Sequence, residues 1–389
     1  MRVFDKLFDK KKEDQPSKET PPQNSAPKAG LSPKMTPLCS STTYQWGFDV
    51  SHDERIICFV APNPTGGGAV SAYDVGTLNQ RWSIPVPFPR SCTCKFVGAN
   101  RVLIINKKGD GKEDVIIQLV NADKGNVVSQ ARGTDIVYMI SAADAKTGLF
   151  VAENLDNIVV ISTAKDKIEV STHNFGQISY YPIIGPDGKI YAIVNSNLGR
   201  LENKSWHRLM EANYYICFDP IGKIYCGGGY DDRSGESALR IYDFQTGRPS
   251  EIPYGREPIE QIALAGSGQV LLANAFYDSP PRYPYATVSL FSVTQQKNIW
   301  DIKIEDSQNG IKPIVLSVPK EKWALIQTGT LIKRIYLENG KTLETLPKTA
   351  TENIGGYWLA SKRILYISRN LAIPHKPRGA GTIECYKID

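Results

Sequence analysis

The sequence predicts an all-β fold, a β-propeller of four-stranded blades, with eight blades as the first prediction and seven as the alternative. From Tyr44 onward, short runs rich in Val, Ile, Tyr and Phe alternate with clusters of Gly, Asn, Asp and Pro, which is the pattern of strands and turns. No segment keeps an apolar stripe at helical spacing over three turns, so long helices are not expected. A strand unit also recurs with a period of about 43 residues, which is the length of a propeller blade.

The N-terminal residues differ in composition from the rest of the chain. Residues 1–12 are predicted to form a short amphipathic segment, because four apolar side chains would share one helical stripe: Val3, Phe4, Leu7 and Phe8. This segment is a candidate for docking to a protein groove or an anionic membrane surface, and the alternative is a frayed, solubilising end. Residues 13–34 are rich in Pro, Ser, Lys and Glu, which predicts a disordered linker.

The predicted propeller occupies residues 35–389, and its repeat is clearest where the third strand of a unit turns into the fourth. That junction reads AYDVGTLNQRWSIPV at 72–86 and RIYDFQTGRPSEIP at 240–253. The last unit has only three strands, and Met35–Thr43 is predicted to supply the missing one, which would close the ring and remove its open sheet edges. The predicted units are 44–86, 91–131, 134–173, 176–210, 213–253, 257–304, 310–347 and 352–389, of which the third and fourth are the least regular.

The same junction carries a family resemblance. In the first unit, the spacing resembles the tryptophan-docking repeat of the quinoprotein-like eight-bladed propellers, through Ala72, Asp74, Thr77 and Trp82. Trp300 follows Ser292 at the same spacing, whereas the unit with Asp243 carries Glu251 in place of the tryptophan. The WD-repeat family is a weaker match, because a Trp-Asp pair occurs once and the Gly-His dipeptide is absent. The resemblance implies an architecture, and propellers of one architecture host many functions.

Composition and charge exclude several classes of protein. The chain has 389 residues with a formal net charge of +6, and residues 1–40 and 41–389 each carry a basic surplus of three, which leaves no dominant nucleic-acid footprint. No apolar run is long enough to span a membrane, and Asp5, Lys6 and Asp9 interrupt any secretory signal. Seven irregularly spaced cysteines argue against a disulfide framework and for a reducing compartment, so a cytoplasmic location is expected.

Strand polarity predicts where a binding site would lie. In a four-stranded antiparallel blade, the connections between second and third strands emerge on one face, together with the blade-to-blade connections. Five of these connections are long, and long loops on a rigid scaffold often bind partners: Pro62–Ala69, Lys107–Asp114, Gly227–Ser237, Asn274–Ala286 and Asn370–Gly381. Their Tyr and Arg side chains are typical of protein interfaces, and the last loop adds a basic cluster. The candidate partner-binding residues are Tyr230, Asp231, Arg233, Tyr277, Arg282, Tyr283, Tyr285, His375, Lys376 and Arg378.

Catalytic, metal and cofactor motifs are scarce. The four histidines fall in different parts of the chain, and no zinc-protease, nucleotide-binding or serine-hydrolase motif occurs. The acidic loop at 108–114 lacks the spacing of a calcium loop, and Cys92 and Cys94 have no further ligands at zinc spacing. The quinone-dependent dehydrogenases that the chain resembles use two adjacent cysteines, whereas Thr93 separates Cys92 from Cys94, so quinone binding is not expected. We therefore predict no catalytic residue, no metal and no cofactor.

These observations together predict a non-catalytic scaffold that binds a protein partner through the loop-rich face, with the N-terminal arm as a second docking element. One alternative is an enzyme or small-ligand binder that uses the central channel. That alternative requires titratable side chains on the innermost strands, predicted at Tyr44–Val50, Ile178–Ile184, Tyr214–Phe218, Ile259–Leu264 and Ile314–Val318, and the last three are mainly apolar. A second alternative is a nucleic-acid-binding propeller, led by the basic residues Lys107, Lys108, His375, Lys376 and Arg378.

Overall fold

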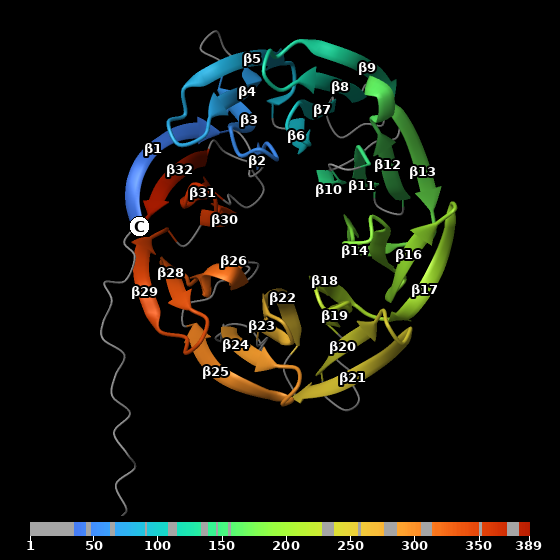
Figure 1. Cartoon of the computed structure of the whole chain (residues 1–389), viewed down its shortest axis with the longest axis vertical. Helices are drawn as coiled ribbons and strands as arrows, with labels where there is room; N and C mark the ends of the chain where they lie inside the picture. The colour runs from blue at the N-terminus through green and yellow to red at the C-terminus, as the bar shows by residue number, and fades with distance from the viewer. Residues whose placement is uncertain are drawn as a thin grey trace, which may run out of the picture. The chain divides into compact units, whose positions relative to one another are not determined.

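The computed structural model is an eight-bladed β-propeller, as predicted, with four antiparallel strands in each blade (Figure 1). The described residues form one compact unit. They are 35–43, 48–62, 67–89, 92–107, 115–133, 139–144, 147–154, 157–227, 237–255, 258–275, 286–304, 313–349, 352–371 and 381–389. Residues 1–34, which include the predicted docking side chains Val3, Phe4, Leu7 and Phe8, lie outside this set.

The first four blades correspond to the first four predicted units, including the two least regular ones, so the count of eight replaces the alternative of seven. Blade 1 contains Phe48–Val50 (β2), Ile56–Pro62 (β3), Gly68–Asp74 (β4) and Gln80–Val86 (β5). Blade 2 contains Cys92–Val97 (β6), Arg101–Lys107 (β7), Val115–Asn121 (β8) and Val127–Gly133 (β9). Blade 3 contains Met139–Asp144 (β10), Leu149–Asn154 (β11), Asn157–Ser162 (β12), the short helix Ala164–Asp166 (η2) and Glu169–Asn174 (β13). Blade 4 contains Ile178–Ile184 (β14), Ile190–Val194 (β15), Asn197–Glu202 (β16) and Ser205–Glu211 (β17).

The other four blades complete the ring. Blade 5 contains Tyr214–Asp219 (β18), Lys223–Gly227 (β19), Ser237–Asp243 (β20) and Arg248–Gly255 (β21). Blade 6 contains Ile259–Gly266 (β22), Gln269–Ala275 (β23), Ala286–Ser292 (β24) and Lys297–Ile304 (β25). Blade 7 contains Ile314–Val318 (β26), the short helix Pro319–Glu321 (η3), Trp323–Gln327 (β27), Leu331–Tyr336 (β28) and Thr342–Pro347 (β29). Blade 8 contains Glu352–Leu359 (β30), Ile364–Leu371 (β31), Gly381–Ile388 (β32) and Met35–Thr43 (β1).

Strand β1 closes the ring as the sequence predicted. It is the outermost strand of blade 8 and pairs antiparallel with β32, from Met35 opposite Ile388 to Thr43 opposite Gly381. In Figure 1 the blue β1 therefore lies beside the red β32, although they belong to opposite ends of the chain. The backbone N–H of Met35 also donates to the carboxylate of Glu344 in blade 7, at 3.1 and 3.2 Å, which ties the closing strand to the neighbouring blade.

The hydrophobic core lies between the blades. The second strand of a blade has a sheet neighbour on each side and a neighbouring blade over each face, so its side chains are buried in both directions. Residues 56–60 in β3 and 323–327 in β27 are accordingly all buried, which explains why 56–60 and 323–326 are continuous apolar runs without alternation. The fourth strands face solvent on one side, and β13 is almost wholly exposed.

The predicted tryptophan-docking contacts hold neighbouring blades together. The Nε1–H of Trp82 in blade 1 donates to the carbonyl oxygen of Ala122 in blade 2 at 2.6 Å, and the indole ring covers Gly125. Trp300 repeats this contact between blades 6 and 7, where it donates to the carbonyl of Leu337 at 2.8 Å and lies over Gly340. The conserved spacing within this chain therefore reflects one repeated contact between blades.

Buried polar side chains add further links between blades. In blade 5, the carboxylate of Asp219 accepts the hydroxyl of Tyr225 at 2.8 Å and the backbone N–H of Gly268 in blade 6 at 2.9 Å. The amide of Gln261 in blade 6 exchanges two hydrogen bonds with the backbone of Ile314 in blade 7, at 2.6 and 2.9 Å. These contacts satisfy backbone groups that would otherwise be costly to bury.

Candidate partner-binding face

The loop-bearing face is the face on which second strands end and third strands begin. All eight blades have the same strand order from the centre outward, so the strand ends that border the five long connections lie on this one face. They are the ends of β3, β7, β19, β23 and β31. The predicted partner-binding side chains all fall within the connections and lie outside the described residues: Tyr230, Asp231, Arg233, Tyr277, Arg282, Tyr283, Tyr285, His375, Lys376 and Arg378. What the structure describes is the base from which these loops start.

Buried polar groups hold several of the loop bases in place. Asn106, the penultimate residue of β7, is 3% exposed and donates from Nδ2 to the carbonyl oxygen of Phe88 at 2.9 Å. Ser237, the first residue of β20, is buried and its hydroxyl donates to the carbonyl of Gly255 at 3.3 Å. The loops at 108–114 and 228–236 therefore start or end at fixed positions on the propeller.

The most elaborate of these bases supports the loop at 372–380. The Arg369 guanidinium in β31 donates to the carboxylate of Glu384 in β32 at 2.7 Å and to the carbonyl of Pro347 in blade 7 at 2.6 Å. Its Nη1 also lies 3.5 Å from the Glu352 carboxylate. The hydroxyl of Tyr386 donates to the same Glu384 carboxylate at 2.7 Å, and burial together with that carboxylate raises the pKa of Tyr386 to about 12.

Lys348 extends this charged base across the junction of blades 7 and 8. Its ammonium group is buried and donates to the carbonyl oxygens of Gly329 and Thr349, each at 2.9 Å. Burial lowers the pKa of Lys348, although the nearby Glu352 carboxylate opposes that shift. We refer to Lys348, Glu352, Arg369 and Glu384 as the blade 7/8 cluster. Sequence reasoning missed it, and the only local signal was the position of Arg369, just before the basic loop that carries His375.

Four of the five predicted innermost segments are strands β14, β18, β22 and β26, and β2 covers Phe48–Val50 of the fifth, whose residues 44–47 lie outside the described residues. Several polar side chains of these strands contact a neighbouring blade. The carboxylate of Asp49 in β2 accepts the backbone N–H of Phe96 at 2.7 Å and the ammonium group of Lys95 at 3.4 Å, both from blade 2. Burial raises the pKa of Asp49, while Lys95 opposes that shift. The hydroxyl of Ser317 in β26 donates to the carbonyl of Leu264 in blade 6 at 2.6 Å. These groups act as links within the ring wall.

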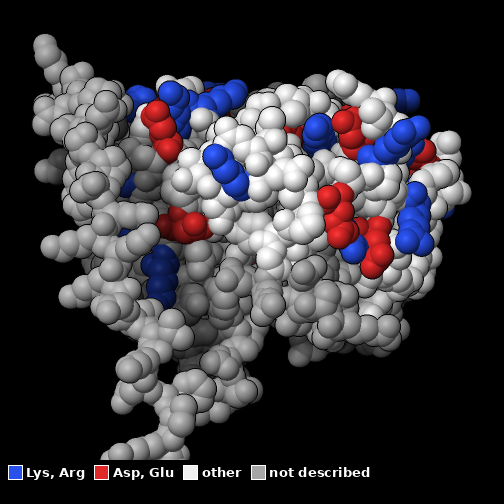
Figure 2. All heavy atoms as spheres, turned by 90° about the horizontal axis from the view of Figure 1, so that it is seen from below, with Lys and Arg blue, Asp and Glu red and all other residues white. Residues whose placement is uncertain are grey.

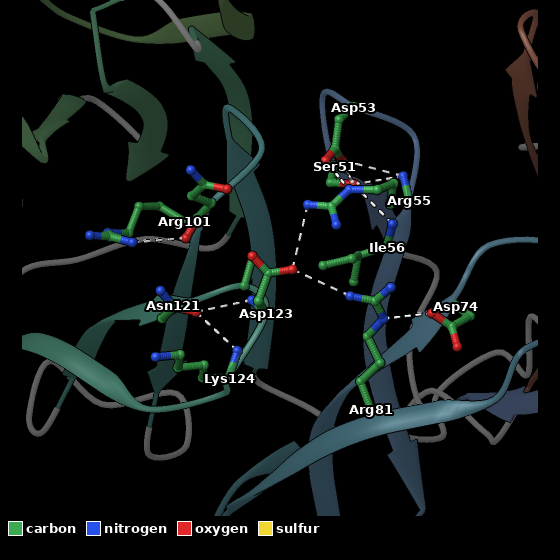
Figure 3. Close-up of polar contacts among 12 residues, drawn as sticks. Ser51, Asp53, Arg55, Ile56, Asp74, Arg81, Arg101, Asn121, Asp123 and Lys124 are labelled. Carbon is green, nitrogen blue, oxygen red and sulfur yellow. Dashed lines mark hydrogen bonds and ion pairs between the residues drawn. The ribbon is translucent and has the colours of Figure 1, made fainter.

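The opposite face, which we call the turn-bearing face, carries a network of ion pairs between short turns (Figure 3). Asp123 in blade 2 lies 3.3 Å from Arg81 and 3.5 Å from Arg55, both in blade 1. Arg81 also pairs with Asp74 at 2.6 Å, where the third strand of blade 1 ends. Each pair is partly exposed, so each adds at most about 1 kcal/mol to stability. Figure 2 shows basic and acidic side chains interspersed on the surface that it displays.

The described histidines lie in different blades, and five of the described cysteines are buried. His52, His173 and His207 belong to blades 1, 3 and 4. Cys92 and Cys94 are buried between blades 1 and 2, and the Cys94 thiol donates to the carbonyl of Cys58 at 3.6 Å, so this pair has a packing role. Among the described residues, no three His, Cys, Asp or Glu side chains gather closely enough to hold a metal ion. Within the same residues, no helix is long and apolar enough to cross a membrane.

Comparison with known proteins adds information on the fold. No protein-family model and no curated protein sequence matches this chain. Among solved structures, the Dos1 propeller is similar over 91% of this chain and 95% of its own, with a TM-score of 0.60 and 10% identity. The quinohemoprotein alcohol dehydrogenase ADHIIG from Pseudomonas putida HK5 is similar over 91% of this chain and 76% of its own, with a TM-score of 0.54 and 8% identity. At these identities the similarity extends to the eight-bladed propeller and not to activity.

Proposed function

We propose that this protein is a non-catalytic scaffold that binds a protein partner through the loop-bearing face of the propeller. The observation that carries the proposal is the buried polar anchoring of the loop bases, above all the Arg369 clamp on Pro347 and Glu384. A rigid base lowers the entropy that a loop loses on binding, so it favours recognition by the side chains above it. The Tyr and Arg content of those loops suits a protein surface more than a small ligand.

The experiment compares capture of partners from native lysate by four versions of the chain. They are the full chain, a version that starts at Met35, a loop variant with Tyr277, Tyr283 and Tyr285 replaced by Ser, and the control variant Tyr336→Ser at the turn-bearing face. We expect one stoichiometric protein to be retained by the full chain, the truncated chain and the control, and lost from the loop variant. The melting temperature of the loop variant should equal that of the full chain.

The other outcomes separate the alternatives. Loss of the partner only on truncation would move the function to residues 1–34. Retention on heparin that falls steeply with salt would favour the nucleic-acid alternative. If no version retains a protein, the scaffold proposal is wrong and the central channel becomes the next site to test, with small-molecule libraries and thermal shift as the readout.

A further inference from the structure

Two cysteines face each other where the ring closes. Cys39 in β1 is the direct cross-strand partner of Cys385 in β32, so the side chains project from the same face of the blade 8 sheet. That face packs against blade 1, where Cys39 and Cys385 belong to one cluster with Ile57 and Phe59. The two thiols lie close enough to influence each other's pKa. The Cys39 thiol also donates to the carbonyl oxygen of Gly76 at 3.6 Å.

The geometry of this pair is close to that of a disulfide. Opposite residues in antiparallel strands have Cα atoms about 4.5–5.5 Å apart, which lies inside the range of about 4.4–6.8 Å found across disulfides. Their Cβ atoms are about 4.5–5.5 Å apart, against about 3.5–4.5 Å in a disulfide, so the strands must approach by about 1 Å. Strand β1 can supply that approach, because it is an edge strand with a register shift between Pro37 and Cys39.

The other described cysteines lack this arrangement. None of them has a cysteine as its cross-strand partner: Cys58, Cys92, Cys94, Cys217 and Cys226. The Cys58 and Cys94 thiols contact each other across blades 1 and 2, but both are buried away from any reagent. Cys39 is only partly buried, whereas Cys385 is fully covered. The pair at the ring closure therefore combines direct opposition with access to one sulfur atom.

We propose that Cys39 and Cys385 form a redox modification site, at which a low-molecular-weight disulfide such as glutathione disulfide converts the two thiols into a disulfide that closes the ring covalently. The Cys39 thiolate attacks one sulfur of glutathione disulfide, forms a mixed disulfide and releases one glutathione thiolate. The Cys385 thiolate then attacks the Cys39 sulfur and releases the second glutathione. The two protein thiols lose two protons and two electrons, and one glutathione disulfide is reduced to two thiols.

The bond would link the first strand of the propeller to the last. In the reduced protein, β1 is held by its pairing with β32 and by the contact of Met35 with Glu344. In the oxidised protein, β1 could not separate from blade 8 even when those contacts break. A cross-link that spans nearly the whole propeller removes many unfolded conformations, so the oxidised form should resist unfolding more than the reduced form. The redox state of the surrounding solution would then set the stability of the ring.

The test treats the reduced full-length protein with glutathione disulfide, alkylates the remaining thiols and maps the peptides under non-reducing conditions. Burial raises the pKa of both thiols, that of Cys385 to about 12, so the reaction should be faster at mildly alkaline than at neutral pH. We expect a cross-linked peptide pair containing Cys39 and Cys385, with the other five cysteines alkylated. The urea midpoint of unfolding should rise and return to its first value after reduction.

Variants make the outcome decisive. Cys39→Ser should lose both the cross-link and the rise in urea midpoint, and Cys39→Ala provides a second variant if the serine is poorly tolerated. Cys217→Ser is the matched control, because Cys217 is also partly buried, and this variant should form the cross-link normally. A cross-link between Cys58 and Cys94 instead, a lasting glutathione adduct on Cys39, or no reaction at Cys39 would each overturn the proposal.

Discussion

The contact between Trp82 and Gly125 leads to a prediction that can be worked out from the structure. Gly125 lies in the turn between β8 and β9 with φ of +72°, and the indole ring of Trp82 from blade 1 covers it. A Cβ atom at this position would lie 2.6 Å from Cγ of Trp82 and 2.8 Å from its Cβ. Replacement of Gly125 by Ala should therefore force the indole ring away from blade 2 and weaken its hydrogen bond to Ala122.

Two costs add up in this variant. A non-glycine residue in the left-handed region costs about 1–2 kcal/mol. Forcing extra volume into a packed contact costs about 1–3 kcal/mol more. We therefore expect Gly125→Ala to lower the free energy of unfolding by about 2–5 kcal/mol. The matched control is Gly98→Ala, because Gly98 has φ of +68° in a comparable turn of the same blade and no atom within 4 Å of its Cβ position. The control should show the backbone cost alone, about 1–2 kcal/mol.

The assay is urea unfolding followed by far-UV circular dichroism, with the transition slope compared among variants to check that they unfold in the same manner. The double variant Gly125→Ala with Trp82→Leu should be more stable than the sum of the single variants predicts, because the smaller side chain relieves the clash. Equal losses for Gly125→Ala and Gly98→Ala would refute the reasoning, since the indole contact would then contribute nothing.

Two further predictions concern buried carboxylates that link blades. Burial raises the pKa of Asp49 above its ordinary value, so the folded protein holds this proton more tightly than the unfolded chain. The free energy of unfolding therefore falls as the pH rises from the pKa of the unfolded state through that of the folded state. Asp49→Asn should remove this fall in stability, which urea midpoints measured at several acidic pH values would show. The same dependence of the midpoint on pH in the variant and the original protein would contradict the prediction. Asp219→Asn should lower the free energy of unfolding by about 1–3 kcal/mol, because either the Tyr225 hydroxyl or the Gly268 N–H loses its buried acceptor. Asp243 is only partly buried and accepts hydrogen bonds within its own turn, so Asp243→Asn should lower the free energy of unfolding less in the same urea titration. Equal losses for the two variants would argue against the link between blades 5 and 6.

Much of the fold could be predicted from residues that are near each other in the chain. The second strands of the blades show as apolar runs, such as the one in β3, because burial on both faces leaves no polar alternation. The junction between the third and fourth strands could be predicted from the spacing between the turn and Trp82. That spacing is fixed because the tryptophan must reach the next blade. The closing strand at Met35–Thr43 could be predicted from the three strands of the last unit alone.

Less of the candidate site could be predicted from residues that are near each other in the chain. Strand polarity predicted which face carries the long loops, since direction alternates strictly within each blade. The blade 7/8 cluster could not be predicted, because Lys348 and Arg369 are separated by a strand and a turn and show no spacing motif. The predicted role of Tyr277 and the other loop side chains stays a prediction, since they lie outside the described residues.

The sequence by itself determined the blade, its period and the strand that closes the ring, because these follow from the burial pattern of short neighbouring segments. Only the tertiary structure decided which distant groups meet: Cys39 opposite Cys385, Asp219 on the backbone of Gly268, and Arg369 on the carbonyl of Pro347. The physical reason is that such contacts depend on the register of paired strands and on how each blade packs against the next. A shift of one residue in register would place Cys39 and Cys385 on opposite faces of the sheet, with no change in the composition of either strand.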